Sequence, residues 1–279
     1  MVETAEQQIK RKNVMQQFAF CGTSEFFSSK LEELSNLAEP EEWTSKRAII
    51  QGYKNDRLYN YIIKTFEYIK AKDLIIFSDD KNYCTYNTGL LTVLGEDIFG
   101  FFERNLNPPK TEPNPQEWKF KGFIKASSRL ITDNFSSKPK LIQYCDNFSD
   151  FYFDTEKDID INIEHIIEDH WNDEDDRFPS ELKNLGKNVV VALINYAVKV
   201  ATIRIKRNNR LVVPQYYNDE IMYLIPLNIS MPNSTSITMA LAVEKTDTGS
   251  YRANTIFDLD MAYTKARLVM KPESNWLIK

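Results

Sequence analysis

The hydrophobic period of the sequence changes near residue 71, and this change constrains the fold more than any other feature. Before it, four apolar residues recur at helical spacing: Leu58, Ile62, Phe66 and Ile69. They predict a helix from Asp56, its N-cap, to Ala71. After it come four short runs rich in aromatic and β-branched residues: "LIIFSDD", "YCTYNTGLL", "DIFGFFER" and "WKFKGFIKA". Turn-forming residues separate these runs, which predicts antiparallel strands.

The second half of the chain predicts a long helix and further strands. The helix begins near Pro179-Ser180 and ends in "RIKRNNR", with this expected core face: Leu182, Leu185, Val189, Leu193, Tyr196 and Val200. The strands are expected at "LVVPQYY", "IMYLIPLNI", "TMALAVEKT" and "YRANTIFDLD", which runs into a short helix, "MAYTKARLV". A last strand is expected at "ESNWLIK".

The predicted fold class is α+β, with a central, mostly antiparallel sheet flanked by helices. Residues 1–55 are polar and contain an expected amphipathic helix from Ser24 to Leu37, so we interpret them as a helical N-terminal extension. Residues 56–279 are expected to form a single α+β domain, because no internal repeat or low-complexity linker divides them.

Composition narrows the class of partner. The net charge of −5 gives no global basic field, so any site for a polyanion must be local. Three cysteines, at spacings that fit neither a zinc site nor a disulfide framework, favour a reducing cytoplasm. No secretory leader or uninterrupted membrane span is visible, so we expect a cytoplasmic protein with no membrane partner.

Known cofactor and metal signatures are absent from the sequence. The eight glycines never cluster into a phosphate loop, and there is no Gly-x-Ser-x-Gly or His-Glu-x-x-His motif, so we expect no cofactor and no metal. The segment 146–176 holds 13 Asp or Glu residues and one Lys. It is interpreted as a solvated acidic loop with a short helix, although His170 with Asp169 and Asp173 offers an alternative divalent-cation site.

Several segments, in order, resemble one known family. They are "YNTGLL…IFGFFERN", "HIIEDH…DRFP", "VPQYY…LIPL" and "TIFDLDMAYTKARLVMKPESNWL". Together they resemble domain of unknown function 3825, from about Leu58 to the C-terminus. The chain departs from the family pattern at Asp258 and at Thr264-Lys265, so no role is carried over to those positions.

The resemblance implies a context rather than a mechanism, because the family is named for an unknown activity. The resemblance implies that family members occur together with cold-shock barrels, winged-helix RNA binders and nuclease domains in bacterial RNA metabolism or defence. Residues 2–55 carry no cold-shock or winged-helix signature. The implied partner is therefore RNA or a nucleotide, by association alone.

His165 and Arg177 form the first candidate site. Apolar neighbours place His165 at the edge of buried structure, and Arg177 precedes the expected long helix. An arginine there would bind a phosphate while the histidine exchanges a proton with an attacking or leaving oxygen. The structural alternatives are a core histidine bonded to backbone and a salt bridge from Arg177 to the acidic segment.

A second candidate site is basic and polar. Its residues follow or end the long helix: Lys199, Arg204, Lys206, Arg207, Asn208, Asn209, Arg210, Gln215 and Tyr216. The cations would contact phosphates, Asn209 and Gln215 would bind base edges or a ribose hydroxyl, and Tyr216 would stack. Alternatively, these cations only stabilise the helix dipole.

The C-terminal motif adds a third set. Asp258 is expected to cap the last helix, on which Asp260, Tyr263 and Arg267 share one face. They form either an internal polar network or part of a ligand pocket, in which Arg267 would hold phosphate. Trp276 is expected in the core or in a pocket wall.

The strand "YCTYNTGLL" contains three residues that are poor strand formers. Gly89 in a strand marks a bulge or a close approach, and Asn87 and Thr88 offer an amide and a hydroxyl there. They either fix a structural bulge or line the same pocket as His165, Arg177 and Gln215.

Two functional hypotheses follow. The first is an RNA- or nucleotide-binding module of a bacterial RNA-processing or defence system. The second is a metal-independent phosphodiesterase or nucleotide-processing enzyme in which His165 is the acid or base and Arg177 and Arg267 hold phosphate. A purely structural scaffold is the remaining alternative.

Overall fold

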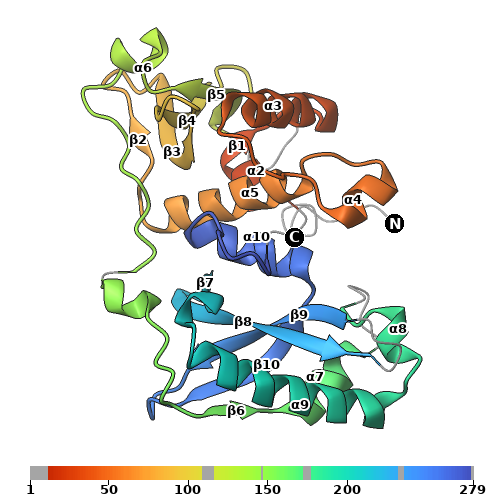
Figure 1. Cartoon of the computed structure of the whole chain (residues 1–279). Helices are drawn as coiled ribbons and strands as arrows, with labels where there is room; N and C mark the ends of the chain where they lie inside the picture. The colour runs from red at the N-terminus through yellow and green to blue at the C-terminus, as the bar shows by residue number, and fades with distance from the viewer. Residues whose placement is uncertain (1–11, 109–115, 146, 172–176, 232–235, 278–279) are drawn as a thin grey trace. The chain divides into compact units, whose positions relative to one another are not determined.

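A computed structural model describes residues 12–108, 116–145, 147–171, 177–231 and 236–277. The fold class is α+β, as expected, but the single expected sheet is two five-stranded sheets. The chain forms two compact units, Met1–Ile142 and Gln143–Lys279 (Figure 1). The boundary lies inside the region that was expected to be one domain.

The first unit is built from α2 (Val14–Phe18), β1 (Ala19–Phe20), α3 (Ser24–Leu37), α4 (Lys46–Gln51), α5 (Asp56–Ala71), β2 (Ile76–Phe77), β3 (Tyr83–Leu91), β4 (Asp97–Arg104), β5 (Trp118–Lys125) and α6 (Arg129–Thr132). The strand order is β1-β5-β4-β3-β2. All neighbours are antiparallel except β1, which pairs with β5 in parallel. The helix expected from Ser24 to Leu37 is confirmed as α3.

The helices of the first unit cover both faces of its sheet. Phe66 of α5 packs edge-on against Tyr86 and lies 5.8 Å from Phe102, between ring centroids. Phe27 of α3 contacts the same face through Phe120. On the opposite face, Ile131 of α6 is buried among Phe99 and Phe101. The alternating aromatic residues of the strands therefore supply two apolar layers.

The Asn87-Thr88-Gly89 segment forms a bulge in β3. The pairing with β4 shifts between Asn87 and Leu90, and Gly89 has φ +75°, which favours glycine. The Asn87 Oδ1 accepts from the Gly89 amide at 2.8 Å, and the Thr88 hydroxyl donates to the Ile98 carbonyl at 2.6 Å. Tyr61 of α5 donates to the Thr88 carbonyl at 2.8 Å. The polar atoms of the bulge are thus bonded within the first unit.

The second unit is built from the 3₁₀ helix η1 (Phe148–Phe151), β6 (Ile159–Ile161), α7 (Ile163–His170), α8 (Ser180–Lys183), α9 (Lys187–Ile205), the 3₁₀ helix η2 (Asn209–Leu211), β7 (Val213–Tyr217), β8 (Glu220–Ser230), β9 (Ser236–Lys245), β10 (Tyr251–Phe257) and α10 (Leu259–Val269). The strand order is β6-β10-β9-β8-β7. Again only the edge strand β6 is parallel to its neighbour, β10.

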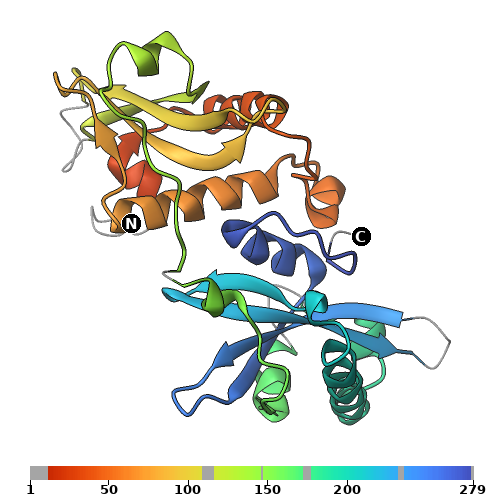
Figure 2. The ribbon, with the colours of Figure 1, turned by 60° about the vertical axis from the view of Figure 1, so that its left-hand side comes forward.

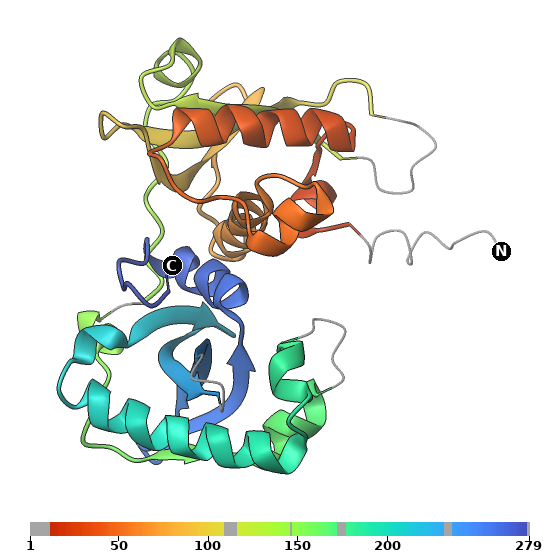
Figure 3. The same cartoon turned by 45° about the vertical axis from the view of Figure 1, so that its right-hand side comes forward.

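The two faces of the second sheet bury different partners. One face packs against α7 and α9, with Ile166 and Ile194 in a cluster that includes Leu241. The other face packs against α10, whose Ala262 contacts the cluster of Ala242 and Phe257. Figures 2 and 3 show this sheet with α10 on one side and α9 on the other. The small residues of α10 allow it to lie close to the strands.

Three local expectations are corrected. Asp56 is not the N-cap of α5: Asn55 is, and the Asp56 Oδ1 accepts instead from the Ser45 amide at 2.8 Å. The expected long helix is two helices, because Gly186, at φ +81°, separates α8 from α9. The expected last strand is a turn, where Trp276 is buried as expected and donates to the Leu211 carbonyl.

The expected core face of α9 is also wrong by one residue. Its buried residues are Val190, Ile194, Ala197, Ala201 and Ile205, whereas Val189 and Tyr196 are exposed. Apolar residues surround this helix, so periodicity alone does not identify the buried side. Among the described helices, α9 alone is long and apolar enough to span a membrane. That is weak evidence, because core helices pass the same test.

Candidate functional site

A hollow of about 390 Å³ opens on the α10 face of the second sheet, within the size range of small-molecule sites. Its lining comes from α7, the segment before α8, four strands and α10: His165, Asp169, His170, Arg177, Gln215, Tyr217, Met222, Ala242, Glu244, Arg252, Asn254, Thr255, Phe257 and Lys265. We call it the sheet hollow. A second hollow of about 570 Å³ adjoins it and shares His165, Arg252 and Asn254.

A bulge in β10 directs polar side chains toward the sheet hollow. The pairing with β9 shifts between Ala253 and Thr255, which places Asn254 outside the regular ladder. Arg252, Asn254 and Thr255 consequently all line the hollow. Bulges are common next to active sites, because they redirect a side chain that a regular strand would send to the other face.

Two cations converge on one aromatic ring in the hollow. The Lys265 Nζ lies 4.9 Å from the Phe257 ring centroid and 5.1 Å from that of Tyr217. The Arg177 Cζ lies 5.7 Å from the Phe257 centroid. A cation over an aromatic face is attracted by the ring, so these contacts hold both positive charges at the wall of the hollow.

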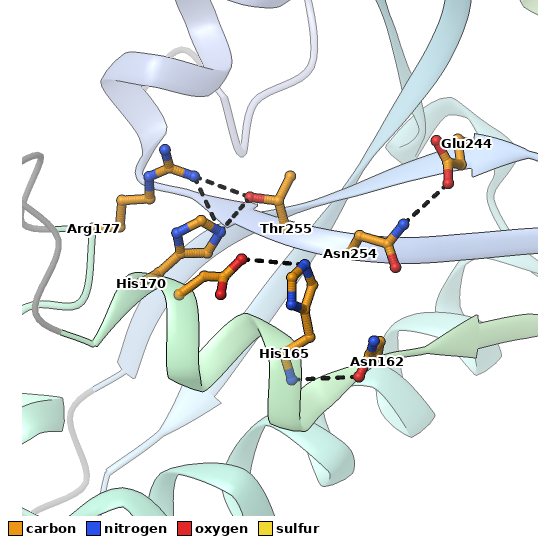
Figure 4. A network of polar contacts seen from close by, with 8 residues as sticks. Asn162, His165, His170, Arg177, Glu244, Asn254 and Thr255 are labelled. Atoms are coloured by element: carbon orange, nitrogen blue, oxygen red, sulfur yellow. Dashed lines mark hydrogen bonds and ion pairs between the residues drawn. The ribbon is translucent and has the colours of Figure 1, made fainter.

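Hydrogen bonds connect α7 to β10 beside these cations (Figure 4). The Thr255 Oγ1 lies 3.0 Å from the His170 Nε2, and the Arg177 Nη1 donates to Thr255 Oγ1 at 3.0 Å. The Arg177 Nη1 also lies 3.3 Å from the His170 Nε2. Arg177 is thereby fixed against the sheet, on the wall of the hollow.

A second histidine faces the same hollow from α7. The His165 Nε2 lies 3.2 Å from the Asp169 Oδ2, one helical turn away, and both side chains are about half exposed. The Asn254 amide donates to Glu244 at 3.0 Å nearby (Figure 4). A histidine oriented by a carboxylate at the edge of a cavity is suited to proton transfer.

Gln215 is the most unusual residue of the lining. Its side chain is 2% exposed, yet its Oε1 has no hydrogen-bond partner among the described residues. A buried polar atom without a partner costs roughly 1–3 kcal/mol. Gln215 lines the hollow, so a ligand with a hydrogen-bond donor would supply the missing partner.

The structure brings three of the predicted site residues together: His165, Arg177 and Gln215 line one hollow. Tyr216 points to the opposite face of β7, where its ring lies 4.9 Å from that of Tyr144. Successive strand residues alternate in direction, so Gln215 and Tyr216 do not form one site.

The remaining predicted residues lie elsewhere. Arg204, Arg207 and Asn209 are exposed at the end of α9 and in η2, outside the lining of the sheet hollow. On α10, which Asp258 caps as expected, Tyr263 is in the apolar cluster. Asp260 is half-buried and Arg267 is buried, and neither belongs to the lining.

Asn87 and Thr88 belong to the first unit, and the lining of the sheet hollow belongs entirely to the second. Their bonds within β3, β4 and α5 match the structural interpretation of the bulge. Within the described residues, no three His, Cys, Asp or Glu residues are grouped to hold a metal ion. The alternative cation site needs Asp173, which lies outside the described residues.

Sequence reasoning missed His170 as a partner of Thr255, and it missed Arg252, Asn254, Thr255 and Lys265. The strand "YRANTIF" carries a clear signal, since Arg, Asn and Thr interrupt an otherwise apolar pattern. Lys265 departs from the family pattern, so the family resemblance assigns no role to it. Its contact with Phe257 depends on the packing of α10 against the sheet, which local sequence does not contain.

Comparison with known families supports the resemblance. A family model described as "Domain of unknown function (DUF3825)" matches residues 34–276. The match includes parts of both compact units. Comparison with the curated proteins and with the solved structures finds no match.

Proposed function

Because the chain belongs to the DUF3825 family, whose description names no activity, we propose its function from the sheet hollow: the second unit binds RNA or a nucleotide there. The observation that carries this proposal is Gln215, a buried amide at the wall of the sheet hollow whose Oε1 has no hydrogen-bond partner in the described part of the chain. A bacterial RNA-processing or defence system is the proposed setting.

The chemistry of the lining matches the parts of a nucleotide. Arg177 and Lys265 provide positive charge for phosphate, and Phe257 and Tyr217 provide aromatic surface. The Gln215 amide would bind a base amino group or a ribose hydroxyl. The adjoining hollow, which shares Arg252, gives room for a further nucleotide of a strand.

The test is retention of a labelled single-stranded RNA and of labelled nucleotides by the purified chain. Arg177→Ala and Lys265→Ala should each weaken retention about tenfold, because each removes a charged contact of roughly 1.5 kcal/mol or more. Both variants must first show an unchanged thermal transition.

The exposed arginines at the end of α9 provide the discriminating control. Arg204, Arg207 and Arg210 changed together to Glu should leave retention nearly unchanged if the sheet hollow is the site. Loss of retention in this triple variant, together with normal retention in Arg177→Ala and Lys265→Ala, would move the site to that surface and reject the proposal.

A second candidate function is metal-independent phosphodiester or nucleotide hydrolysis. It is favoured by the 3.2 Å contact of His165 with Asp169, which pairs an acid or base with an orienting carboxylate. Arg177 would hold the phosphate. Lys265, which lines the hollow, would be the second phosphate ligand instead of Arg267, which is buried outside the lining.

The His165→Ala variant separates binding from hydrolysis. It should retain RNA or nucleotide like the unchanged chain and lose roughly 10²–10⁴-fold in turnover, the usual contribution of a positioned acid or base. The measurement is product release from a pool of RNA and nucleotides, with Asp169→Asn as an intermediate variant. Equal turnover by His165→Ala and the unchanged chain would exclude this mechanism.

A further inference from the structure

The two units share one topology. In each, the first strand is an edge strand, helices follow it, and a four-stranded antiparallel meander ends beside it, in the orders β1-β5-β4-β3-β2 and β6-β10-β9-β8-β7. In each, the first strand pairs with the last in parallel, and a helix follows the last strand. Figure 1 labels both sets of elements.

The correspondence extends to the register of individual residues. The edge strands pair Ala19 with Trp118 in one unit and Ile159 with Tyr251 in the other, which aligns Trp118 with Tyr251. The last strand of each unit then bulges at the same place. Lys121 and Asn254, each three residues further on, stand outside their ladders.

This register aligns polar residues of the two sheets. Glu103 pairs with Lys119 in the first unit, and Glu244 pairs with Arg252 at the equivalent positions of the second. The bulged residue contacts the carboxylate in both: the Lys121 Nζ lies 3.0 Å from the Glu103 Oε1, and the Asn254 amide donates to Glu244 at 3.0 Å. Glu244 and Arg252 line the sheet hollow.

The first unit has a hollow at the matching place. It has a volume of about 550 Å³, and its lining is Asn82, Tyr83, Glu103, Arg104, Asn105, Leu106, Asn107 and Lys119. Arg104 and Lys119 are exposed, and neither forms an ion pair within the described residues, whereas Glu103 is neutralised by Lys121. The Tyr83 ring is fixed by stacking on Phe101 at 5.4 Å.

We propose that this hollow of the first unit is a second binding site for single-stranded RNA. The inference rests on the proposed function of the second unit, because it transfers the same ligand class to an equivalent position. Arg104 and Lys119 contact phosphate, Tyr83 gives a base an aromatic surface, and the asparagine amides bind polar edges. The Thr255 position is Gly122 in this unit, so the hydroxyl that bonds Arg177 in the second unit has no counterpart here.

The test is photo-crosslinking of a short single-stranded RNA that contains 4-thiouridine, with mass spectrometry to identify the crosslinked peptides. The full chain should give crosslinks in the 82–119 region and in the 215–222 region. Arg104→Ala with Lys119→Ala should lower the first set about a hundredfold and leave the second unchanged, since two charged contacts are lost and each contributes about tenfold. Lys46→Ala with Lys70→Ala, two exposed lysines outside the hollow, is the matched control.

The outcomes separate the two proposals. Two results would overturn the second site and leave the proposed function intact. One is that crosslinks occur only in the second unit. The other is that Arg104→Ala with Lys119→Ala gives first-unit crosslinks in the same yield as the unchanged chain. The double variant Arg177→Ala with Lys265→Ala tests the sheet hollow. If its second-unit crosslinks are as strong as those of the unchanged chain and its first-unit crosslinks remain, the sheet hollow is rejected instead. Absence of crosslinks in both units rejects both.

Discussion

Gly100→Ala is expected to destabilise the first unit by about 3 kcal/mol, the upper end of the usual cost of overpacking a core. Gly100 lies directly opposite Tyr86 in the β3–β4 ladder, and the Tyr86 ring lies across it. An added Cβ would meet ring atoms of Tyr86 at 2.1 and 2.5 Å, far inside van der Waals contact. Tyr86 is fully buried against Phe66 and Phe102, so its ring has no space to withdraw.

Differential scanning calorimetry of the full chain measures this effect as a lower melting temperature of the first unit, by about 6–12 °C. Gly95→Ala is the matched control: its Cβ meets nothing within 4 Å, and only its positive φ adds strain, of roughly 1–2 kcal/mol. Tyr86→Leu should partly rescue Gly100→Ala, because it removes the clashing ring. A Gly100→Ala variant as stable as Gly95→Ala would contradict the steric explanation.

Sequence pattern predicted helices well wherever one face alone is apolar. The bounds of α3, and of α5 from Asp56 to Ala71, match expectation because their apolar residues recur with one phase. The buried face of α9 was misassigned because apolar residues occur on both of its sides. Ile194 is buried and Tyr196 is exposed because of the way α9 packs against the sheet, which is a tertiary contact.

The candidate site was predicted in part. His165, Arg177 and Gln215 could be predicted from their side-chain chemistry, and they line one hollow. Thr255 and Asn254 could not be assigned, because the bulge that turns them to one face is defined by pairing with β9. Lys265 needs the docking of α10, which is a tertiary contact.

The shared topology of the two units was invisible in the sequence. Equivalent positions hold different residues: Phe99 and Phe101 of β4 align with Ala240 and Ala242 of β9. Bulky residues fill the space over the first sheet, whereas small ones leave room for α10 over the second. A fold needs only a matching apolar pattern and matching register, so two sequences can keep the plan and lose their similarity.

The second large effect is expected from Gln215→Met, which should raise stability and lower ligand retention together. Met has a similar length and no amide group, so it removes a buried Oε1 that none of the described residues bonds. Loss of that penalty should stabilise the second unit by roughly 1–3 kcal/mol. The same change removes the group that we propose binds the ligand, so retention of RNA or nucleotide should fall roughly 10- to 100-fold.

The opposite signs of these two effects distinguish a binding residue from a structural one. Asn228→Met in β8 is the matched control, because the Asn228 Oδ1 already accepts from the Thr238 hydroxyl at 2.9 Å. That control should lower stability by roughly 1 kcal/mol and leave retention unchanged. Calorimetry and a retention assay on both variants provide the measurement. A Gln215→Met chain that is less stable than the original would show that the amide already has a partner, and the main support for the sheet hollow as a binding site would be lost.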